Sequence, residues 1–509
     1  MATEQYYLAL DLGAESGRAI LGALERGKLE ISEEHRFPTG PEYVPTMYPG
    51  DAPEKIGSDI SLIWDFIRFW HEIKDGVCKA ATKGNLKAIG VDTWGVDFAL
   101  LDRSGGLISL PYHYRDNRSN GMTDEAFKRL GRKQIFDITG IQFLPLNTIF
   151  QLLSMVVYES PLLQIVDKFL MVPDLINYWL TGRAVAEFTE ATTTQMLDAK
   201  TGKWSDQILS AMGFPKHIFP EIVPPGTVIG PIRESLEKEL DLKAVVVAPA
   251  SHDTGAAVSA VPAESEDYIW ISSGTWSIVG MNTPEPVINE KSYSYNLTNE
   301  GGLNGTYRFS KNVMGLWIVQ QCKNQWKKEG KEYSYTELTS LAEKSPSLKS
   351  FADPDFEEFL WPGNMVEKVK KYCQITDQPV PQSEGEVVRT VLEGLALKYR
   401  YVIEKLEEVS GKMTSVVHIV GGGTKNRLLN QFTADALGRK VIAGPIEATS
   451  TGNLIVQAIA MGDIKNWEEG VSVIRASFDI ETFHPGDQDP WNKAYEEFIN
   501  NFNKINQAF

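Results

Sequence analysis

The sequence has little cysteine and no long apolar stretch. Its 509 residues include only three cysteines, Cys78, Cys322 and Cys373, which form no CxxC pair and no zinc-binding spacing. This excludes a disulfide scaffold and fits a reducing cytoplasm. The longest apolar runs, such as AVVVA at 244–248, have the length of a core strand and not of a membrane span. The opening MATEQYYLAL lacks a basic leader followed by a long apolar stretch, so we expect neither a signal peptide nor a membrane partner.

Positive charge is also scarce. The chain has 50 Lys and Arg residues against 67 Asp and Glu residues, a formal net charge of −17. A chain this acidic repels a phosphate backbone, which argues against nucleic acid as a partner but still allows a local pocket for a small phosphate. A length of 509 residues with 42% apolar residues predicts a globular protein of two or three domains.

Apolar runs around glycine-containing turns predict two β-hairpins. In the first, residues 6–10 and 19–24 flank the turn DLGAESG, and the second spans residues 268–280, YIWISSGTWSIVG. At an offset of 261 positions, Asp11, Gly13 and Ser16 of the first hairpin fall on Ser272, Gly274 and Ser277 of the second. The match predicts a duplication, with α/β domains at 1–245 and 246–509.

Periodicity predicts the other elements. Helical spacing occurs at 62–77, 151–158, 173–180, 256–260, 312–320, 426–437 and 450–461. Strand-like runs occur at 86–91, 98–101, 244–249, 416–420 and 440–443. From residue 416 onward the order is strand, helix, strand, helix, which predicts a parallel part of a sheet.

Both hairpin turns are rich in glycine and hydroxyl residues. Such turns expose backbone N–H groups and hydroxyls that can hold phosphate oxygens. Asp11, at the entrance to the first turn, could hold Mg²⁺ directly or through water. Ordinary hairpin turns have the same composition, so the pattern alone leaves both interpretations open.

A run of glycines, Gly421 to Gly423, lies between a predicted strand and a predicted helix. Without side chains there, a nucleotide could approach the backbone, or the strand and helix could simply pack closely. Asn426 stands where the dinucleotide fingerprint GxGxxG needs glycine, and no GxxxxGK[ST] sequence occurs in the chain.

Acidic residues follow two predicted strands. Asp253, in SHDTG, would lie at a helix N-terminus, where a carboxylate either caps the helix or accepts a proton from a substrate hydroxyl. His252 beside it could bind a sugar hydroxyl or be structural. The segment DTWGVD, Asp92 to Asp97, could bind a sugar through its acids and indole, or Trp94 could be core and Asp97 a turn residue. Gly95 would let a ligand approach the backbone.

In this order, the motifs resemble those of the FGGY family of carbohydrate kinases, in the superfamily of hexokinase, actin and the heat-shock ATPases. The matching stretches cover nearly the whole chain: DLGAESGR (11–18), IGVDTWGVDFALLD (89–102), YRDNRSNGM (114–122), GIQFLPLNT (140–148), ATTTQ (191–195), ASHDT (250–254), SSGTWS (272–277), TNEGG (298–302), KNVMGLW (311–317), HIVGGGTKN (418–426) and GPIEATSTGN (444–453). Of these, DTWGVDF, GIQFLP, ATTTQ and NVMGLW are typical of family members that act on L-rhamnulose.

The resemblance implies two ribonuclease H-like α/β domains with the active site in the cleft between them. The N-terminal domain would carry the first phosphate hairpin and the sugar-binding face. The C-terminal domain would carry the catalytic aspartate, the second phosphate hairpin and the adenosine site. The expected activity is ATP-dependent phosphorylation of L-rhamnulose at its C1 hydroxyl.

The resemblance also implies roles for single residues. ATP would contact Ala14, Glu15, Ser16, Gly17, Arg18, Thr275, Gln320 and Gly422. The sugar would contact Gly95, His252, Asp253, Thr254 and Asn312. Asp253 would accept the proton of the C1 hydroxyl, and Asp11 would help to place Mg²⁺.

Two features depart from the family pattern. Glu15 puts a carboxylate in the phosphate turn, where small hydroxyl residues are common, and residues 41–59 differ from the short connection expected there. The alternatives are a kinase of fuculose, xylulose or glycerol, an actin-like or heat-shock-like ATPase that needs no sugar, and a sugar sensor, which should lack the base. The sequence leaves open whether the protein is a monomer or a homodimer.

Overall fold

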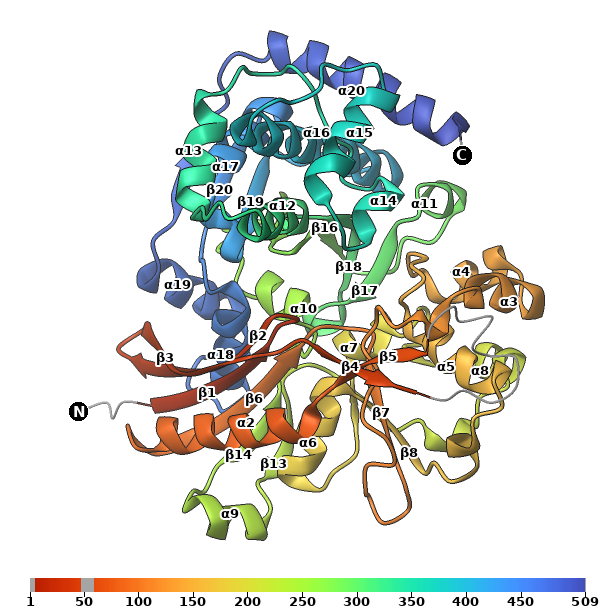
Figure 1. Cartoon of the computed structure of the whole chain (residues 1–509). Helices are drawn as coiled ribbons and strands as arrows, with labels where there is room; N and C mark the ends of the chain where they lie inside the picture. The colour runs from red at the N-terminus through yellow and green to blue at the C-terminus, as the bar shows by residue number, and fades with distance from the viewer. Residues whose placement is uncertain (1–4, 47–58, 509) are drawn as a thin grey trace. The chain divides into compact units, whose positions relative to one another are not determined.

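A computed structural model of the chain describes residues 5–46 and 59–508 (Figure 1). These residues divide into two compact units, each built from separate stretches of the chain. The first comprises Met1–Ala260, Asn282–Phe309 and Ala448–Ser477, and the second comprises Val261–Met281, Ser310–Glu447 and Phe478–Phe509. Part of the predicted segment 41–59, residues 47–58, lies outside the described residues.

The first unit is built around a mixed sheet in the strand order β13-β14-β6-β1-β2-β3. Its strands are β1 (Gln5–Leu12), β2 (Ser16–Glu25), β3 (Lys28–Pro38), β6 (Leu86–Thr93), β13 (Thr227–Pro231) and β14 (Val245–Ala248). The first three form antiparallel pairs, β6 runs parallel to β1, and β14 runs parallel to β6. The carboxyl ends of β1, β6 and β14 therefore share one edge of the sheet.

Helices cover both faces of this sheet (Figure 1). A Cβ atom added at Gly76 of α2 (Phe66–Ala81) would lie 2.7 Å from the Ala19 Cβ, and one added at Gly22 would lie 2.8 Å from Leu454 of α18 (Ala448–Ala460). Ala19 and Gly22 are three residues apart on β2, so the Cβ of Ala19 and a Cβ built at Gly22 point to opposite faces of the sheet. Helix α6 (Val172–Thr181) shares the apolar core under α2.

The other elements of this unit are β4 (Pro41–Pro45), β5 (Ile60–Trp64), β7 (Phe98–Leu101), η1 (Asn117–Ser119), α3 (Met122–Arg129), α4 (Arg132–Thr139), α5 (Thr148–Val157), η2 (Pro161–Gln164), β8 (Lys168–Met171), β9 (Ala186–Glu187), α7 (Phe188–Thr193), β10 (Leu197–Asp198), β11 (Lys203–Trp204), α8 (Asp206–Met212), η3 (Lys216–Ile218), β12 (Ile222–Val223), α9 (Glu234–Leu240), α10 (Asp253–Val258), α11 (Glu290–Ser294), β17 (Thr298–Gly301), η4 (Leu303–Gly305) and α19 (Trp467–Ser477).

The second sheet has seven strands in the order β17-β18-β16-β15-β19-β20-β21, of which β17 belongs to the first unit. The elements of the second unit are β15 (Tyr268–Ser273), β16 (Trp276–Thr283), β18 (Tyr307–Met314, which begins in the first unit), α12 (Trp317–Lys328), α13 (Tyr335–Lys344), α14 (Glu357–Leu360), α15 (Met365–Ile375), α16 (Glu384–Ser410), β19 (Val416–Val420), η5 (Gly422–Lys425), α17 (Arg427–Leu437), β20 (Lys440–Ala443), β21 (Glu481–Phe483) and α20 (Asp489–Ala508). The predicted parallel pairing after residue 416 is confirmed, because β15, β19 and β20 are parallel.

The predicted duplication is confirmed by the strand pairing. The series β2-β1-β6-β14 in the first unit and β16-β15-β19-β20 in the second have the same order and the same relative directions. The hairpins differ by one residue, however. Asp11 pairs with Arg18, whereas Ser272 pairs with Ile278. The second turn is therefore one residue shorter, and the predicted match of Ser16 with Ser277 is wrong by one position.

Two predicted helices, 62–77 and 312–320, are wrong in their first residues, which form β-strands. Residues 60–64 form β5, which pairs with β4, and α2 starts only after Asp65, whose side chain accepts a hydrogen bond from Arg68 N. Residues 307–314 form β18, so Asn312 lies within a strand and does not cap a helix. Helix α12 begins at Trp317 instead. In both cases pairing with a neighbouring strand decides the conformation. The local spacing of apolar residues cannot predict that pairing.

The first unit extends past the predicted boundary at 245. That position starts β14, which lies inside the first sheet, and Asp253 on α10 belongs to the first unit with it. A Cβ atom at Gly452 of α18 would lie 1.9 Å from Ala256 O, so α10 and α18 pack backbone to backbone. This contact brings a late segment of the sequence into the first unit.

The thiols of Cys78, Cys322 and Cys373 are free, with only Cys78 exposed. Across residues 5–46 and 59–508, no helix combines the length and the apolar character needed to cross a bilayer.

Candidate functional site

The predicted sugar-binding and catalytic residues of the first unit gather at the shared edge of its parallel strands. Asp11 lies near the end of β1, and Gly95 follows β6. His252 and Asp253 come four and five residues after β14 ends. Thr93 N donates to Ser251 O over 2.9 Å, which joins the segments that follow β6 and β14. Ligands of open α/β sheets commonly bind at such carboxyl ends.

Asp253 is the first residue of α10 and is partly open to solvent. Its Oδ1 accepts hydrogen bonds from Thr254 N over 2.5 Å and Thr254 Oγ1 over 3.2 Å, while 34% of its side-chain surface remains exposed. Burial raises the pKa of Asp253, a protonated His252 would oppose that change, and the Asp11 carboxylate adds to it. A carboxylate with a raised pKa and an open surface is suited to accept a proton.

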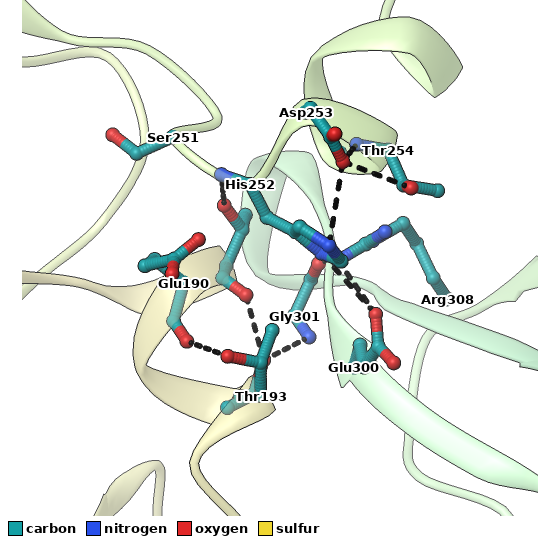
Figure 2. Close-up of polar contacts among 12 residues, drawn as sticks. Glu190, Thr193, Ser251, His252, Asp253, Thr254, Glu300, Gly301 and Arg308 are labelled. Carbon is teal, nitrogen blue, oxygen red and sulfur yellow. Dashed lines mark hydrogen bonds and ion pairs between the residues drawn. The ribbon is translucent and has the colours of Figure 1, made fainter. Parts of the chain in front are cut away.

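His252 is held by two charged side chains from β17 and β18. Arg308 Nη2 lies 2.9 Å from His252 Nδ1, and Glu300 Oε2 lies 3.1 Å from Arg308 Nη2 (Figure 2). On the opposite side of the ring, His252 Nε2 lies 3.5 Å from Asp253 Oδ1. The imidazole thus lies between Arg308 and the predicted base.

Gly95 lies next to a backbone in an unusual conformation. Val96 has φ 69°, a value that costs a β-branched residue energy, of order 1–3 kcal/mol. The turn is held by three side chains: Val96 N donates to Thr193 Oγ1 over 3.1 Å, and Val96 O accepts from Thr148 Oγ1 over 2.6 Å and from Gln151 Nε2 over 3.2 Å. Two of the narrow motifs, DTWGVDF and ATTTQ, therefore meet at this turn with Thr148 of the matching stretch GIQFLPLNT.

The acids of DTWGVD are buried. Asp97 is 0% exposed, and its carboxylate accepts hydrogen bonds from Trp64 Nε1 over 2.6 Å, Trp94 Nε1 over 3.0 Å and Gln151 Nε2 over 2.9 Å. Burial raises the pKa of Asp97 to about 6, although these hydrogen bonds act to lower it. Asp92 is also 0% exposed. The structure therefore supports the structural interpretation of Trp94 and Asp97, whereas Gly95 and Val96 of the same segment are half-buried.

The first hairpin turn is closed by Gly13 N, which donates to Ser16 O over 3.0 Å. Ala14 and Ser16 are half-buried, and Glu15 is exposed. Gly17 is needed for packing, since a Cβ there would lie 2.3 Å from Phe37 Cζ. The turn is therefore open at Ala14 and Glu15.

Asp11 and Arg18, across the base of this hairpin, form an ion pair of 2.5 Å. Asp11 Oδ2 also accepts a hydrogen bond from Ser450 Oγ over 2.8 Å. Asp92 Oδ1 is buried with no hydrogen-bond partner among the described residues. Burial, followed by the charge of Asp11, raises the pKa of Asp92, and Asp253 adds to the effect. The edge thus holds acids that repel one another, a setting that fits a cation.

In the second unit, Thr275 and Gln320 come together. Thr275 occupies the turn between β15 and β16, and Gln320 Nε2 donates to Thr275 Oγ1 over 3.4 Å. Thr275 O accepts from Gly315 N over 3.1 Å and from Trp317 N over 3.2 Å, which fixes the start of α12 at this turn. Asn312 is half-buried on β18.

The glycines of GGGTKN have different reasons to be glycine. A Cβ at Gly423 would lie 2.0 Å from Ser273 Oγ, and Gly421 has φ +89°, so packing and backbone conformation explain both. Gly422 is exposed, and an added Cβ would meet nothing within 4 Å. The packing of the protein gives no reason for glycine there, which keeps contact with a nucleotide open as the explanation.

Sequence reasoning missed the side chains that support the strand end. The Glu187 carboxylate, 0% exposed, accepts from Ser251 N over 3.0 Å and from Thr189 Oγ1 over 2.5 Å, and Thr189 Oγ1 accepts from His252 N over 3.2 Å. Glu300 and Arg308 were also unassigned. Glu300 lies in the matching stretch TNEGG, which could have indicated it from the sequence. Glu187 and Arg308 lie outside all of the matching stretches.

Comparison with known proteins shows which family the chain belongs to. The model of the FGGY family of carbohydrate kinases, N-terminal domain, matches residues 6–259, and the model of its C-terminal domain matches residues 269–461. This chain belongs to the FGGY family of carbohydrate kinases. The predicted family membership and two-domain fold class are confirmed.

The chain is similar to rhamnulokinases over nearly its whole length. It is 39% identical to the rhamnulokinase of Bacteroides thetaiotaomicron, covering 98% of this chain and 99% of that protein. It is 40% identical to the rhamnulokinase of Oceanobacillus iheyensis, covering 94% and 98%.

Solved structures of other sugar-related kinases share the fold. A gluconate kinase from Lactobacillus acidophilus superposes with a TM-score of 0.78 at 17% identity, covering 99% of this chain and 98% of that one. A xylulose kinase from Rhodospirillum rubrum gives 0.78 at 17% identity and covers 99% of both chains. These similarities concern the fold alone.

Proposed function

We propose that this FGGY kinase transfers the γ-phosphoryl group of ATP to the C1 hydroxyl of L-rhamnulose, giving L-rhamnulose 1-phosphate and ADP in L-rhamnose catabolism. The observation that carries the proposal is the partly open carboxylate of Asp253, with its raised pKa, at the edge where the rhamnulokinase-like motifs meet. The rhamnulokinase relatives, at 39% and 40% identity, support L-rhamnulose over other sugars.

In this mechanism Asp253 takes the proton of the C1 hydroxyl as its oxygen attacks the γ-phosphorus. The new P–O bond forms while the bond from the γ-phosphorus to the β–γ bridging oxygen breaks, and ADP leaves. Gly95, His252 and Thr254 hold the sugar so that the C1 hydroxyl points at Asp253. Positioning of this kind supplies much of the rate in phosphoryl transfer.

The phosphates of ATP contact the first hairpin turn through Ala14, Ser16, Gly17 and Arg18. Glu15 contributes its backbone, because its side chain is exposed. In the second unit, Thr275, Gln320 and Gly422 contact ATP, and Asn312 contacts the sugar.

Mg²⁺ fits the acids at the strand ends, and Asp11 would hold it. Among the described residues no group of three or more His, Cys, Asp or Glu side chains forms a metal cage. Mg²⁺ that accompanies ATP usually keeps several waters and needs only one or two carboxylates. When bound, it supplies positive charge to the phosphate oxygens. The free thiols of the chain suit a cytoplasmic enzyme.

ADP release from MgATP tests the proposal, with L-rhamnulose, L-fuculose, D-xylulose, L-ribulose, glycerol and no sugar assayed in parallel. We expect the highest kcat/KM for L-rhamnulose and measurable side activity on related ketoses, because one hydroxyl or methyl group often discriminates by only ~1–3 kcal/mol. A clear preference for another acceptor contradicts the substrate assignment. ADP release that no acceptor stimulates contradicts the kinase assignment and favours the ATPase alternative.

A further inference from the structure

Arg308 and Glu300 form a buried pair behind His252. Arg308 is 1% exposed and Glu300 is 4% exposed. Besides the contact with His252, Arg308 donates from Nε to Gly301 O over 2.7 Å, which anchors the guanidinium on the backbone of β17. Figure 2 shows the arginine, the glutamate and the imidazole converging on one point beside Asp253. Burial of a charged pair is costly unless each charge is well partnered, so this arrangement needs an explanation.

The contact with Arg308 favours one protonation state of the imidazole. A guanidinium nitrogen can only donate a hydrogen bond, and at 2.9 Å the acceptor is His252 Nδ1. When Nδ1 accepts this hydrogen bond it carries a lone pair, and the ring is then neutral with its hydrogen on Nε2. Nε2 faces Asp253, whose Oδ1 is 3.5 Å away.

A competing state is present in the same geometry. Glu300 Oε2 lies 3.3 Å from His252 Nδ1, where it would accept a hydrogen bond from a protonated Nδ1. The charged groups around the pair are Glu187, Glu190 and Asp253, which all act on Arg308 electrostatically. Two observations favour the neutral ring: the shorter contact is the one from Arg308, and Glu300 lies 3.1 Å from Arg308, whose charge it can balance.

We propose that Arg308, itself held by Glu300, is a positioning residue that locks His252 as the Nε2–H tautomer. This inference rests on the proposed function, in which His252 binds the sugar. With the hydrogen on Nε2, His252 donates to a sugar oxygen next to the hydroxyl that Asp253 deprotonates. With the other tautomer, Nε2 would be an acceptor, and the site would present two acceptors and no donor at that point of the sugar.

The direct test is nitrogen NMR of the full chain labelled with ¹⁵N-histidine, without sugar or nucleotide, at neutral pH. The His252→Asn variant identifies which ring signals belong to His252. We expect an unprotonated, pyridine-like Nδ1 and a protonated, pyrrole-like Nε2. A ring with protons on both nitrogens, or a proton on Nδ1 alone, overturns the proposal. This measurement does not depend on which sugar is the substrate, so it separates a failure of the proposal from a failure of the proposed function.

Variants of Arg308 supply the functional test. Arg308→Met keeps most of the side-chain volume and removes the donor, whereas Arg308→Lys keeps a charged donor. We expect Arg308→Met to lose the fixed tautomer and to raise the KM for the preferred sugar by about tenfold, the size of one hydrogen bond. The KM for ATP should change by less than about twofold, and Arg308→Lys should recover part of the loss in the same measurement.

Arg389 provides a matched control. It is a buried arginine of the second unit that pairs with Glu393 over 2.7 Å, and it has no contact with His252. Arg389→Met should lower the melting temperature without changing the His252 signals or the KM for the sugar. If Arg308→Met keeps the Nε2–H signals and the parent KM for the sugar, the positioning role is wrong. If it does not fold, the spectrum of the parent protein still decides the tautomer.

Discussion

Two neighbouring strand ends of the first unit carry acids in similar sequence settings but use them differently. After β6, Asp97 is 0% exposed, and its carboxylate accepts hydrogen bonds from the indoles of Trp64 and Trp94 and from the Gln151 amide. After β14, Asp253 is bonded mainly to its own helix and keeps 34% of its side chain exposed. Both follow a buried strand of the same parallel edge. The difference lies in the side chains that other segments bring to each acid, so an acid at a strand end is a candidate base only where its neighbours leave it open.

The two acids also differ in what burial does for them. Burial raises the pKa of Asp97 to about 6, which leaves it mostly ionised at neutral pH and held by fixed donors. The same effect on Asp253 acts on a group with a free surface, so its proton can exchange with a bound substrate. We therefore expect substitutions at Asp97 to change stability and substitutions at Asp253 to change turnover.

The largest expected effect is that of Asp253→Asn. Loss of the base should lower kcat by ~10²–10⁴-fold, while the KM for ATP changes little. Because the folded protein raises the pKa of this group, the carboxylate is less favourable in the folded state than in the unfolded chain at neutral pH, so the melting temperature should not fall. Steady-state kinetics measure kcat and the KM for ATP, and thermal melts measure the melting temperature. Turnover within a few-fold of the parent would remove Asp253 from the mechanism.

The pH profile of the parent enzyme provides a second check on Asp253. A base must be deprotonated to act, so kcat/KM for the sugar should fall as the pH decreases through the pKa of Asp253. Since that pKa is raised, the midpoint should lie above the usual aspartate value of ~3.9. Any residual activity of Asp253→Asn should lack this acid limb. A parent profile that stays flat down to about pH 4 would contradict the raised pKa.

Asp97→Asn should have the second largest effect, on stability. The amide nitrogen would face donors from Gln151 or the indoles, so we expect a loss of about 1–3 kcal/mol in the free energy of unfolding. The kcat per folded molecule should stay within a few-fold of the parent. Urea denaturation gives the free energy, and Asp137→Asn, which removes an exposed carboxylate of the same unit, serves as the control. A strong loss of kcat with normal stability would instead make Asp97 part of the catalytic site.

The smallest expected effect is that of Thr193→Val, which keeps the shape and removes the hydroxyl that accepts from Val96 N. The turn at Gly95 should relax and raise the KM for the sugar by roughly 3–10-fold, with the KM for ATP unchanged. Thr201→Val, on an exposed turn, is the control. If stability falls but the KM for the sugar does not move, the turn supports the fold and does not contact the sugar.

Local patterns in the sequence predicted the elements whose conformation depends on nearby residues. The hairpin turns, the strand at 416–420 and the helix that Asn426 caps are examples, because glycine, capping and apolar alternation act within a few residues. Residues 62–64 and 312–314 were predicted as helix and form strands, because their partners are strands from elsewhere in the chain. Local patterns also indicated Asp11, Asp253 and His252 as candidate site residues, and the family resemblance added most of the ATP-binding residues.

The sequence by itself determined the family, the duplicated hairpins and the position of Asp253 at the start of a helix, because these follow from motifs and from contacts close along the chain. Only the tertiary structure decided that the Asp97 side chain is buried and the Asp253 side chain is partly exposed. It also decided that α18 belongs with the first unit and that Arg308 lies behind His252. Arg308 and His252 are 56 residues apart. Their contact follows from strand pairing and side-chain packing over that distance, which a local pattern of residues does not encode.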